Sequence, residues 1–208
     1  MNLSFKQYRA IDLTIMAVLL AISEAIATVA AAKWFPDQLF SVSTTLAIVC
    51  IVMIRWDGYA IFHAAVGGCV YCLVLGASAQ QFAIYCVGNC GALIALVIIK
   101  LMGKKKIAEK FYNSVLYVVV AFLGLELGRW GMSLIFQNAD ESGRTGGALT
   151  MLVDFLIIDC ITLVFAIVAV LISRRMDGLF EDQRSYLLRI NEEQRKEREN
   201  KKNENNWY

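Results

Sequence analysis

Six ionisable side chains stand inside long apolar stretches of this 208-residue sequence, where a charge is costly. They are Glu24, His63, Glu126, Arg129, Asp154 and Asp159. In the hydrocarbon of a bilayer such groups face the interior of a helix bundle, pair with one another, or line the path of a ligand. Because four acids accompany one arginine, negative charge is left unmatched. Either some acids are protonated, or a cationic or amine-bearing ligand neutralises them.

Helical spacing indicates which side chains look into a common space, because positions three, four and seven apart share one face of a helix. One stretch presents on such a face Glu126, Arg129, Trp130 and Ser133. A second stretch presents Gln81, Tyr85, Asn89 and Ala92. An acid, a base, an amide and aromatic rings among apolar walls are typical of a small-ligand site.

These patterns predict a substrate-binding site in a polar chamber open to the outer side of the membrane. Its residues are Glu24, Gln81, Tyr85, Asn89, Glu126, Arg129, Trp130 and Asp154. Asp154 and Asp159 lie five positions apart, about 140° round a helix, so only one of the two faces the chamber. The sequence leaves open which one it is.

A structural interpretation competes with binding for each of these residues. Glu126 and Arg129 could neutralise each other across one turn, and Tyr85 or Asn89 could hydrogen-bond between helices. His63 stands among small residues and is expected to pack as a core histidine. Binding is favoured for the set as a whole, because the excess of acids has no partner in the sequence.

No catalytic motif is present. The sequence lacks the GxSxG and HExxH patterns of hydrolases, and without a GxxxxGK[ST] loop it cannot hydrolyse ATP by the P-loop route. All six cysteines fall inside apolar runs, where a thiol packs as a small apolar group. Cys69 and Cys72 form a CxxC, but no second pair of ligands accompanies them. We therefore expect no enzymatic activity, no cofactor and no metal.

Composition places the chain in a bilayer, with 58% hydrophobic and only 18% charged residues. A net charge of +2 is too small to suggest a nucleic-acid partner. Six apolar runs are predicted to span the membrane as helices, at residues 13–32, 38–54, 58–76, 81–101, 112–136 and 148–173. Residues 1–12 precede them, and residues 174–208 form a charged tail, partly helical and disordered beyond Lys196. The predicted fold is an all-α integral membrane bundle.

Orientation follows from the loops, since Lys and Arg concentrate on the cytoplasmic side. With a cytoplasmic N-terminus, the inner side holds Lys6, Arg9, Arg55, Lys100, Lys104, Lys105, Lys106, Lys110, Arg174 and Arg175. The outer side holds only Lys33 and Arg144. The short second run is counted as a span because five crossings would strand the basic tail outside. Both termini are therefore predicted to be cytoplasmic.

The first apolar run carries Ala17 and Ala21 in the sequence AVLLA, and small residues at this spacing let another helix approach closely. Together with the chain's size, its topology, the short second run and the outer polar chamber, this AxxxA motif resembles the substrate-binding S components of energy-coupling factor (ECF) vitamin transporters. The resemblance covers residues 10–174. It assigns the docking of a transmembrane T component to Ala17 and Ala21.

The resemblance further implies a multi-pass protein of the bacterial plasma membrane that captures a vitamin-like molecule from outside. Delivery would follow by reorientation against the T component and two ABC ATPase subunits. Residues 33–40 would resemble the outer lid over the ligand. No stretch identifies the vitamin, and by charge we look first to a cationic or amine-bearing heterocycle, such as thiamine, its precursors or a deazapurine base.

Two other classes stay open. A proton-coupled secondary carrier of a small cationic solute could use the same acids as a relay, although the two halves of the chain give no clear repeat. An intramembrane enzyme would need a reactive group at the right depth, for which Cys or His near Asp is the only candidate. The sequence also leaves open whether the energising module is shared, and what the tail does.

Overall fold

Helices are the only regular elements in the part of the chain that the structure describes. The computed structural model describes residues 4–34, 40–137 and 148–205. Four stretches are long and apolar enough to cross a membrane: Phe5–Trp34, Thr45–Leu75, Ala79–Met102 and Phe111–Phe136. A fifth is the bent pair Leu149–Ile158 and Cys160–Ser173, if the two count as one span. These helices fit a multi-pass membrane protein.

Helix α1 (Phe5–Trp34) contains the first predicted span and extends it at both ends. Its buried stripe consists of Met16, Leu20, Glu24 and Thr28. The exposed face is apolar and includes Ile11, Ile15, Val18, Leu19, Ile22 and Ile26. A helix whose exposed side is apolar and whose polar residues lie on the side buried in protein is suited to contact with lipid tails.

Helix α2 (Thr45–Trp56) is shorter than the span predicted at 38–54, and residues 40–44 are not helical. At 1.5 Å per residue α2 is about 18 Å long, less than the hydrocarbon thickness of a bilayer. All of its residues are buried, so α2 forms the centre of the core. The preceding sequence Ser-Val-Ser-Thr delays the helix, because Ser and Thr side chains compete for backbone groups.

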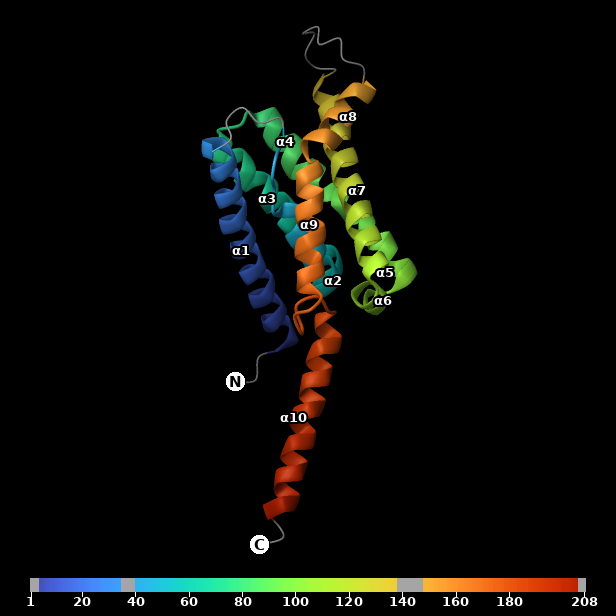
Figure 1. Ribbon diagram of the computed structural model, residues 1–208. Coiled ribbons are helices and arrows are strands. Elements are labelled where there is room, and N and C mark those ends of the chain that lie inside the picture. The colour runs from blue at the N-terminus through green and yellow to red at the C-terminus, as the bar shows by residue number, and fades with distance from the viewer. Residues whose placement is uncertain (1–3, 35–39, 138–147, 206–208) are drawn as a thin grey trace.

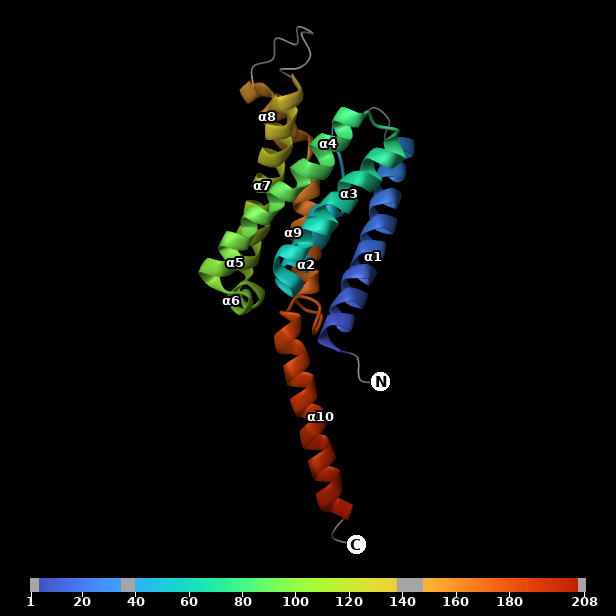
Figure 2. The same ribbon diagram turned by 180° about the vertical axis from the view of Figure 1, so that it is seen from behind.

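The stretch Thr45–Leu75 is in fact two antiparallel helices, because the chain folds back at Asp57 into α3 (Ala60–Leu75). Asp57 has a φ of 52°, and the short helix η1 (Asp57–Tyr59) completes the turn. A Cβ built on Gly67 would overlap the Thr45 side chain. In one continuous helix these positions would lie about 33 Å apart. Figures 1 and 2 show α3 returning beside α2.

The fourth predicted span, 81–101, is built from three consecutive helical segments. These are α4 (Ala79–Gly88), the 3-10 segment η2 (Asn89–Ala95) and α5 (Leu96–Met102). The short helix α6 (Lys104–Glu109) then leads into the next span. The tightened turns of η2 place Asn89 at a junction between two helix types, a change of geometry that often marks a functional position.

Helix α7 (Phe111–Gln137) crosses α4 and η2 at two pairs of glycines. A Cβ on Gly128 would overlap the Gly88 carbonyl oxygen, and a Cβ on Gly91 would overlap the Gly124 carbonyl oxygen. The backbones can approach this closely only because these positions have no side chain. The crossing brings the polar stripes of the two spans face to face.

The last predicted span, 148–173, is broken in its middle. Helices α8 (Ala148–Ile158) and α9 (Cys160–Ser173) meet at Asp159 with a bend of 48°. A bend in a span is tolerated where neighbouring groups satisfy the freed backbone, and Ser41 N–H donates to the Ile158 carbonyl at 2.8 Å. The break therefore sits against the non-helical segment 40–44.

The tail departs from the prediction of disorder beyond Lys196, because α10 (Gln183–Asn205) is one helix. Most of its residues are good helix formers, and Glu192 and Lys196 are opposite charges four apart in the favourable order. In Figures 1 and 2 the helix extends away from the bundle as a rod.

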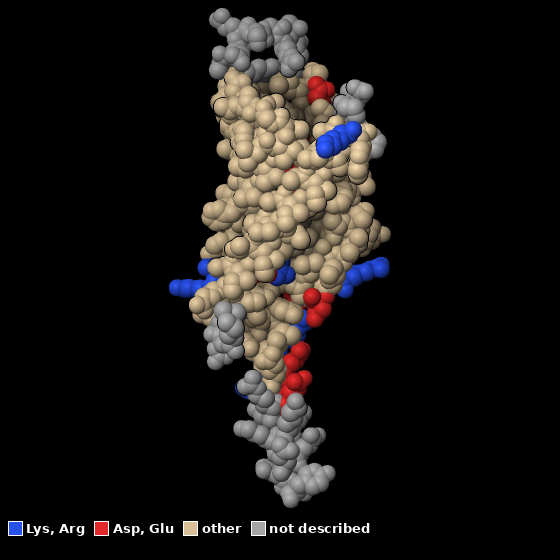
Figure 3. All heavy atoms as spheres, turned by 90° about the vertical axis from the view of Figure 1, so that its left-hand side faces the viewer, with Lys and Arg blue, Asp and Glu red and all other residues tan. Residues whose placement is uncertain are grey.

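The start of α1 and the start of α10 lie at the same end of the bundle, and α10 carries the C-terminal end further away on that side (Figure 1). Seen from the side, the bundle has a tall, almost uncharged surface, and most of the basic and acidic side chains in view gather below it (Figure 3). This distribution is the one expected of a protein embedded in lipid with its charged end in water. The tip of the predicted lid, residues 35–39, and the segment 138–147 lie outside the described residues.

Candidate functional site

Arg129 is the centre of a buried polar cluster in the middle of the bundle. Its side chain is only 4% exposed, and its guanidinium stacks 4.8 Å from the ring centroid of Tyr85. Nε donates to Asn89 Oδ1 at 2.8 Å, and Nη1 donates to Glu126 Oε1 at 3.2 Å and to Asp159 Oδ2. One arginine thus joins α4, α7 and the break between α8 and α9.

The fold positions each partner of Arg129 by a different element. The glycine crossing sets Asn89 against α7, and Asn89 Nδ2 also donates to the Ala64 carbonyl of α3 at 3.3 Å. The break after α8 turns Asp159 inward. Tyr85 is held by Tyr71 of α3, with ring centroids 4.7 Å apart. The site is therefore built by four spans and not by one motif.

The cluster holds one more acid than base. Glu126 and Asp159 are both buried, and Arg129 is their shared cation. The second carboxylate oxygen of Glu126, Oε2, is buried with no hydrogen-bond partner. An unpaired polar atom in such a place is costly, so it calls for a proton or a ligand group that donates to it.

Glu24, another of the predicted site residues, caps the N-terminus of α2 with its carboxylate. Oε2 accepts from Thr44 N–H at 2.8 Å, from Thr45 N–H at 3.1 Å, and from the hydroxyls of Ser43 and Thr44 at 3.0 and 2.9 Å. A negative group is favourable here because the first N–H groups of a helix have no partner within it and carry partial positive charge. The other oxygen, Oε1, is buried without a partner.

The non-helical segment 40–44 connects Glu24 with the Arg129 cluster through hydrogen bonds. Ser43 N–H donates to Thr162 Oγ1 at 3.0 Å, and that hydroxyl donates to the Ser41 carbonyl at 3.3 Å. The Ser41 hydroxyl in turn donates to Asp159 Oδ1. One buried polar network therefore runs from α1, through segment 40–44 and α9, to Arg129.

The structure brings together four of the predicted site residues, namely Tyr85, Asn89, Glu126 and Arg129. It resolves the choice between the two aspartates in favour of Asp159, since Asp154 is exposed. Gln81 is also exposed and serves a local role, because its side chain accepts from Ser78 N–H at 2.9 Å in the cap of α4. Trp130 is half-buried beside the cluster on α7.

Sequence reasoning missed the hydroxyl-bearing members of the network, which are Ser41, Ser43, Thr44 and Thr162, and also Tyr71. The run Ser-Val-Ser-Thr-Thr before an apolar stretch is a signal for the start of a helix. That signal could have indicated that a polar, non-helical segment precedes α2. Nothing in the sequence indicates that the capping acid would come from α1.

The surroundings of His63 and of the two alanines of the AxxxA motif are those of residues that pack between or along helices. His63 is 2% exposed and its Nε2 lies 3.0 Å from the Leu13 carbonyl, as expected of a packed core histidine. Ala17 and Ala21 are half-buried and each follows a buried residue of α1, Met16 or Leu20. They lie at the edge of the exposed apolar face.

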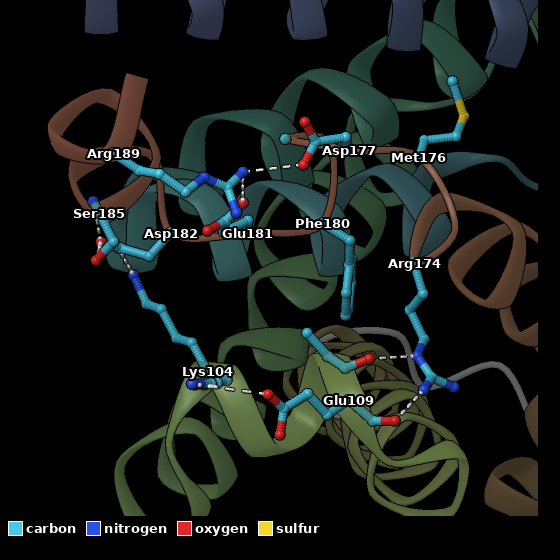
Figure 4. Close-up of a pocket in the computed structure, with 13 residues that line it drawn as sticks. Lys104, Glu109, Arg174, Met176, Asp177, Phe180, Glu181, Asp182, Ser185 and Arg189 are labelled. Atoms are coloured by element: carbon cyan, nitrogen blue, oxygen red, sulfur yellow. Dashed lines mark hydrogen bonds and ion pairs between the residues drawn. The ribbon is translucent and has the colours of Figure 1, made fainter. Parts of the chain in front are cut away.

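A separate cleft of about 1000 Å³ opens at the charged end, between α6, residues 174–182 and the start of α10 (Figure 4). Lys104 Nζ binds Asp57 at 2.8 Å and Asp182 at 2.6 Å, and Arg189 binds Asp177 at 2.9 Å. Arg174 Nε donates to the Ala108 carbonyl at 2.6 Å. These bonds hold the walls of the cleft to each other.

The charged side chains named above already have partners within the cleft, and the ion pairs of Lys104 and Arg189 link α6, residues 177–182 and α10. Partial burial alone would raise the pKa of Asp182, but the hydrogen bonds from Lys104 and from Ser185 hold that pKa below its usual value. Asp182 is therefore ionised at neutral pH and remains paired with Lys104. The predicted binding residues lie elsewhere, in the middle of the spans.

Comparisons with protein-family models, with curated proteins and with solved structures give no match for this chain.

Replacing Glu24 with alanine is expected to lower the free energy of unfolding by about 2–3 kcal/mol, because four donors at the start of α2 lose their acceptor. Glu24→Gln keeps one acceptor oxygen and is expected to lose less. The measurement is chemical unfolding in detergent micelles, followed by tryptophan fluorescence. Equal stability of wild type and Glu24→Ala would show that the cap carries no net energy.

Proposed function

We propose that this protein is the membrane-embedded substrate-binding subunit of an ECF-type importer in the bacterial plasma membrane. It captures a small vitamin-like molecule from outside and delivers it by reorienting against a T component and two ABC ATPase subunits. The observation that carries the proposal is the Arg129 cluster, whose surplus carboxylate is buried in mid-span with an unpaired oxygen on Glu126.

The cluster has the composition of a site for a small polar ligand. Arg129, Asn89 and Glu126 direct hydrogen-bonding groups into it, while Tyr71 and Tyr85 supply aromatic walls. Because acids exceed the base, a cationic or amine-bearing heterocycle is the ligand class best matched to it. Such a ligand would donate to Glu126 Oε2 and stack on the tyrosines.

Irregular backbone beside the cluster also supports binding. Non-helical chain at membrane depth is tolerated where it is buried in protein or lines a cavity, and transporters build their sites from such broken helices. Here the break at Asp159 and the segment 40–44 meet directly at the cluster. A purely structural ion pair would not need two interruptions of helical geometry at the same point.

The T component is proposed to dock on the exposed apolar face of α1, with Ala17 and Ala21 at its edge. Glu24 lies on the buried side of the same helix and is hydrogen-bonded to segment 40–44, which in turn is hydrogen-bonded to Asp159. A shift of α1 on docking would therefore disturb the α2 cap and, through it, the binding cluster. The charged end that carries both termini is proposed to be cytoplasmic.

The proposal is tested by ligand retention and binding in the purified protein. Native mass spectrometry of the wild type is expected to show a copurified small molecule, and Glu126→Gln is expected to weaken its binding at least tenfold, because the surplus charge is removed. Asp154→Asn is the matched control, since that carboxylate is exposed on α8 and removing it is expected to leave affinity unchanged.

Two results would contradict the proposal. One is a wild-type protein that binds no small molecule and forms no complex when coexpressed with a T component and ATPases. The other is proton-driven uptake by this chain alone in liposomes, which would favour a secondary carrier with Glu126 as its proton site. The unpaired Glu126 oxygen is the observation that favours a proton-coupled carrier as the second candidate function.

A further inference from the structure

Two cysteines from neighbouring helices lie in direct contact. Cys69 of α3 and Cys86 of α4 have their Sγ atoms 3.2 Å apart, closer than ordinary packing of two sulfur atoms. The CxxC in the sequence paired Cys69 with Cys72, but the sulfur that contacts Cys69 is that of Cys86 in α4, while Cys72 is buried nearby in α3. The partner of Cys69 is set by the fold and not by the local motif.

Gly68 is the reason for this contact. A Cβ at Gly68 would lie 2.6 Å from the Tyr85 carbonyl carbon and 2.8 Å from the Cys86 backbone nitrogen. Without that Cβ the backbones of α3 and α4 come together at this one point, and the next residue on each side, Cys69 and Cys86, meets across it. Backbones this close bring two cysteines within the span that a disulfide bridges.

The pair is the one place in the described chain where two thiols meet in this way. Cys50 is buried in α2, Cys72 is buried in α3 near Cys69 and Cys86, Cys160 is exposed on α9, and Cys90 donates to the Cys86 carbonyl at 3.4 Å. Among the described residues no group of three His, Cys, Asp or Glu side chains is arranged to hold a metal ion. Cys69 and Cys86 are both half-exposed, so a small reagent can reach them.

We propose that Cys69 and Cys86 are a redox pair that closes to a disulfide by exchange with a small external disulfide. The thiolate of one cysteine attacks a sulfur of the reagent, forming a mixed disulfide and releasing one thiol. The second cysteine then attacks the protein sulfur of that mixed disulfide, which forms the Cys69–Cys86 bond and releases the second thiol. The pair loses two electrons and two protons, and the external disulfide gains them.

The location gives the bond a consequence for the polar cluster. Tyr85 precedes Cys86 in α4, and it contacts both Tyr71 of α3 and the guanidinium of Arg129. A Cys69–Cys86 bond would fix α3 to α4 at the side of the cluster and restrict opening between Tyr71 and Tyr85. Oxidation is therefore a means of holding this part of the bundle closed.

The test uses the full-length protein in detergent and 4,4′-dipyridyl disulfide, a small uncharged disulfide. After reaction, the protein is denatured, alkylated with N-ethylmaleimide and weighed intact. The reduced protein carries six free thiols and is expected to take six adducts. Apart from any mixed disulfide on the exposed Cys160, the oxidised wild type is expected to take two fewer. Chymotrypsin is expected to give a disulfide-linked pair of peptides that joins Cys69 to Cys86, since no Lys or Arg lies between residues 56 and 99 for trypsin to cut. Its unfolding temperature is expected to rise by several degrees.

Variants make each outcome decisive. Cys69→Ser and Cys86→Ser are each expected to abolish the linked peptide and the rise in unfolding temperature, while Cys72→Ser and Cys160→Ser leave both unchanged. Retention of six adducts, a stable mixed disulfide at Cys69 or Cys86 without closure, or a link of either one to another cysteine would each overturn the proposal. None of these readouts depends on a ligand or a transport partner, so they are independent of the proposed function.

Discussion

Replacing Arg129 with alanine is expected to lower the free energy of unfolding by about 3–5 kcal/mol, among the largest effects of any single substitution in this chain. The guanidinium is the shared partner of Glu126 and Asp159, both buried, and it also binds Asn89. Without it, two carboxylates would stay in a low-dielectric region with no cation. The measurement is unfolding of the purified protein in mixed micelles, followed by tryptophan fluorescence.

Two further variants separate charge from shape. Arg129→Lys keeps the charge but loses the planar fork that reaches two acids and an amide at once, so it is expected to recover only part of the loss. The triple variant Arg129→Met, Glu126→Gln, Asp159→Asn removes every charge of the cluster and is expected to regain most of the stability while binding no ligand. Wild-type stability of Arg129→Ala would contradict the account of the cluster given above.

Three of the six predicted spans correspond to long apolar helical stretches in the structure, because hydrophobic length alone indicates them. The runs at 13–32, 81–101 and 112–136 correspond to α1, the α4–η2–α5 segment and α7, each long enough to bury its backbone polar groups in its own hydrogen bonds. The helical repeat also placed Tyr85 with Asn89 and Glu126 with Arg129, since residues on one face of a helix stay on one face after folding.

The interruptions of the helices could not be predicted in the same way. The break at Asp159 falls inside an unbroken apolar run, and it turns Asp159 into the cluster while Asp154 remains exposed on α8. Segment 40–44 is held out of helix by tertiary partners, because Thr162 and Glu24 supply its hydrogen bonds. Partners from other helices decide both features, and a one-dimensional pattern does not contain them.

Glu24 illustrates how a correct observation led to an incomplete role. A carboxylate in mid-span was rightly expected to need a polar partner. That partner is the N-terminus of α2, whose N–H groups compensate a charge as a cation would. A list of charged residues does not include the partial charges of helix ends. From the sequence Glu24 is therefore unmatched, although in the structure one of its oxygens is satisfied.

Replacing Gly128 with valine is expected to destabilise the bundle by about 3 kcal/mol or more, and to reduce the yield of folded protein. A Cβ at Gly128 would overlap the carbonyl oxygen of Gly88, which is backbone and cannot rotate away as a side chain could. The whole crossing of α7 with α4 would have to open, and Arg129, the next residue, would be drawn away from Asn89. Thermal unfolding in detergent and size-exclusion chromatography measure the loss.

Gly131→Val is the matched control for this prediction. It lies one turn further along α7, and no atom lies within 4 Å of a Cβ built there. The same substitution in the same helix should therefore leave the unfolding temperature nearly unchanged, which removes helix propensity and added bulk as explanations. If both variants were equally stable, the glycine crossing would not hold the polar stripes together. If both were equally unstable, valine itself would be the cause, and the close approach of Gly128 to Gly88 would carry none of the effect.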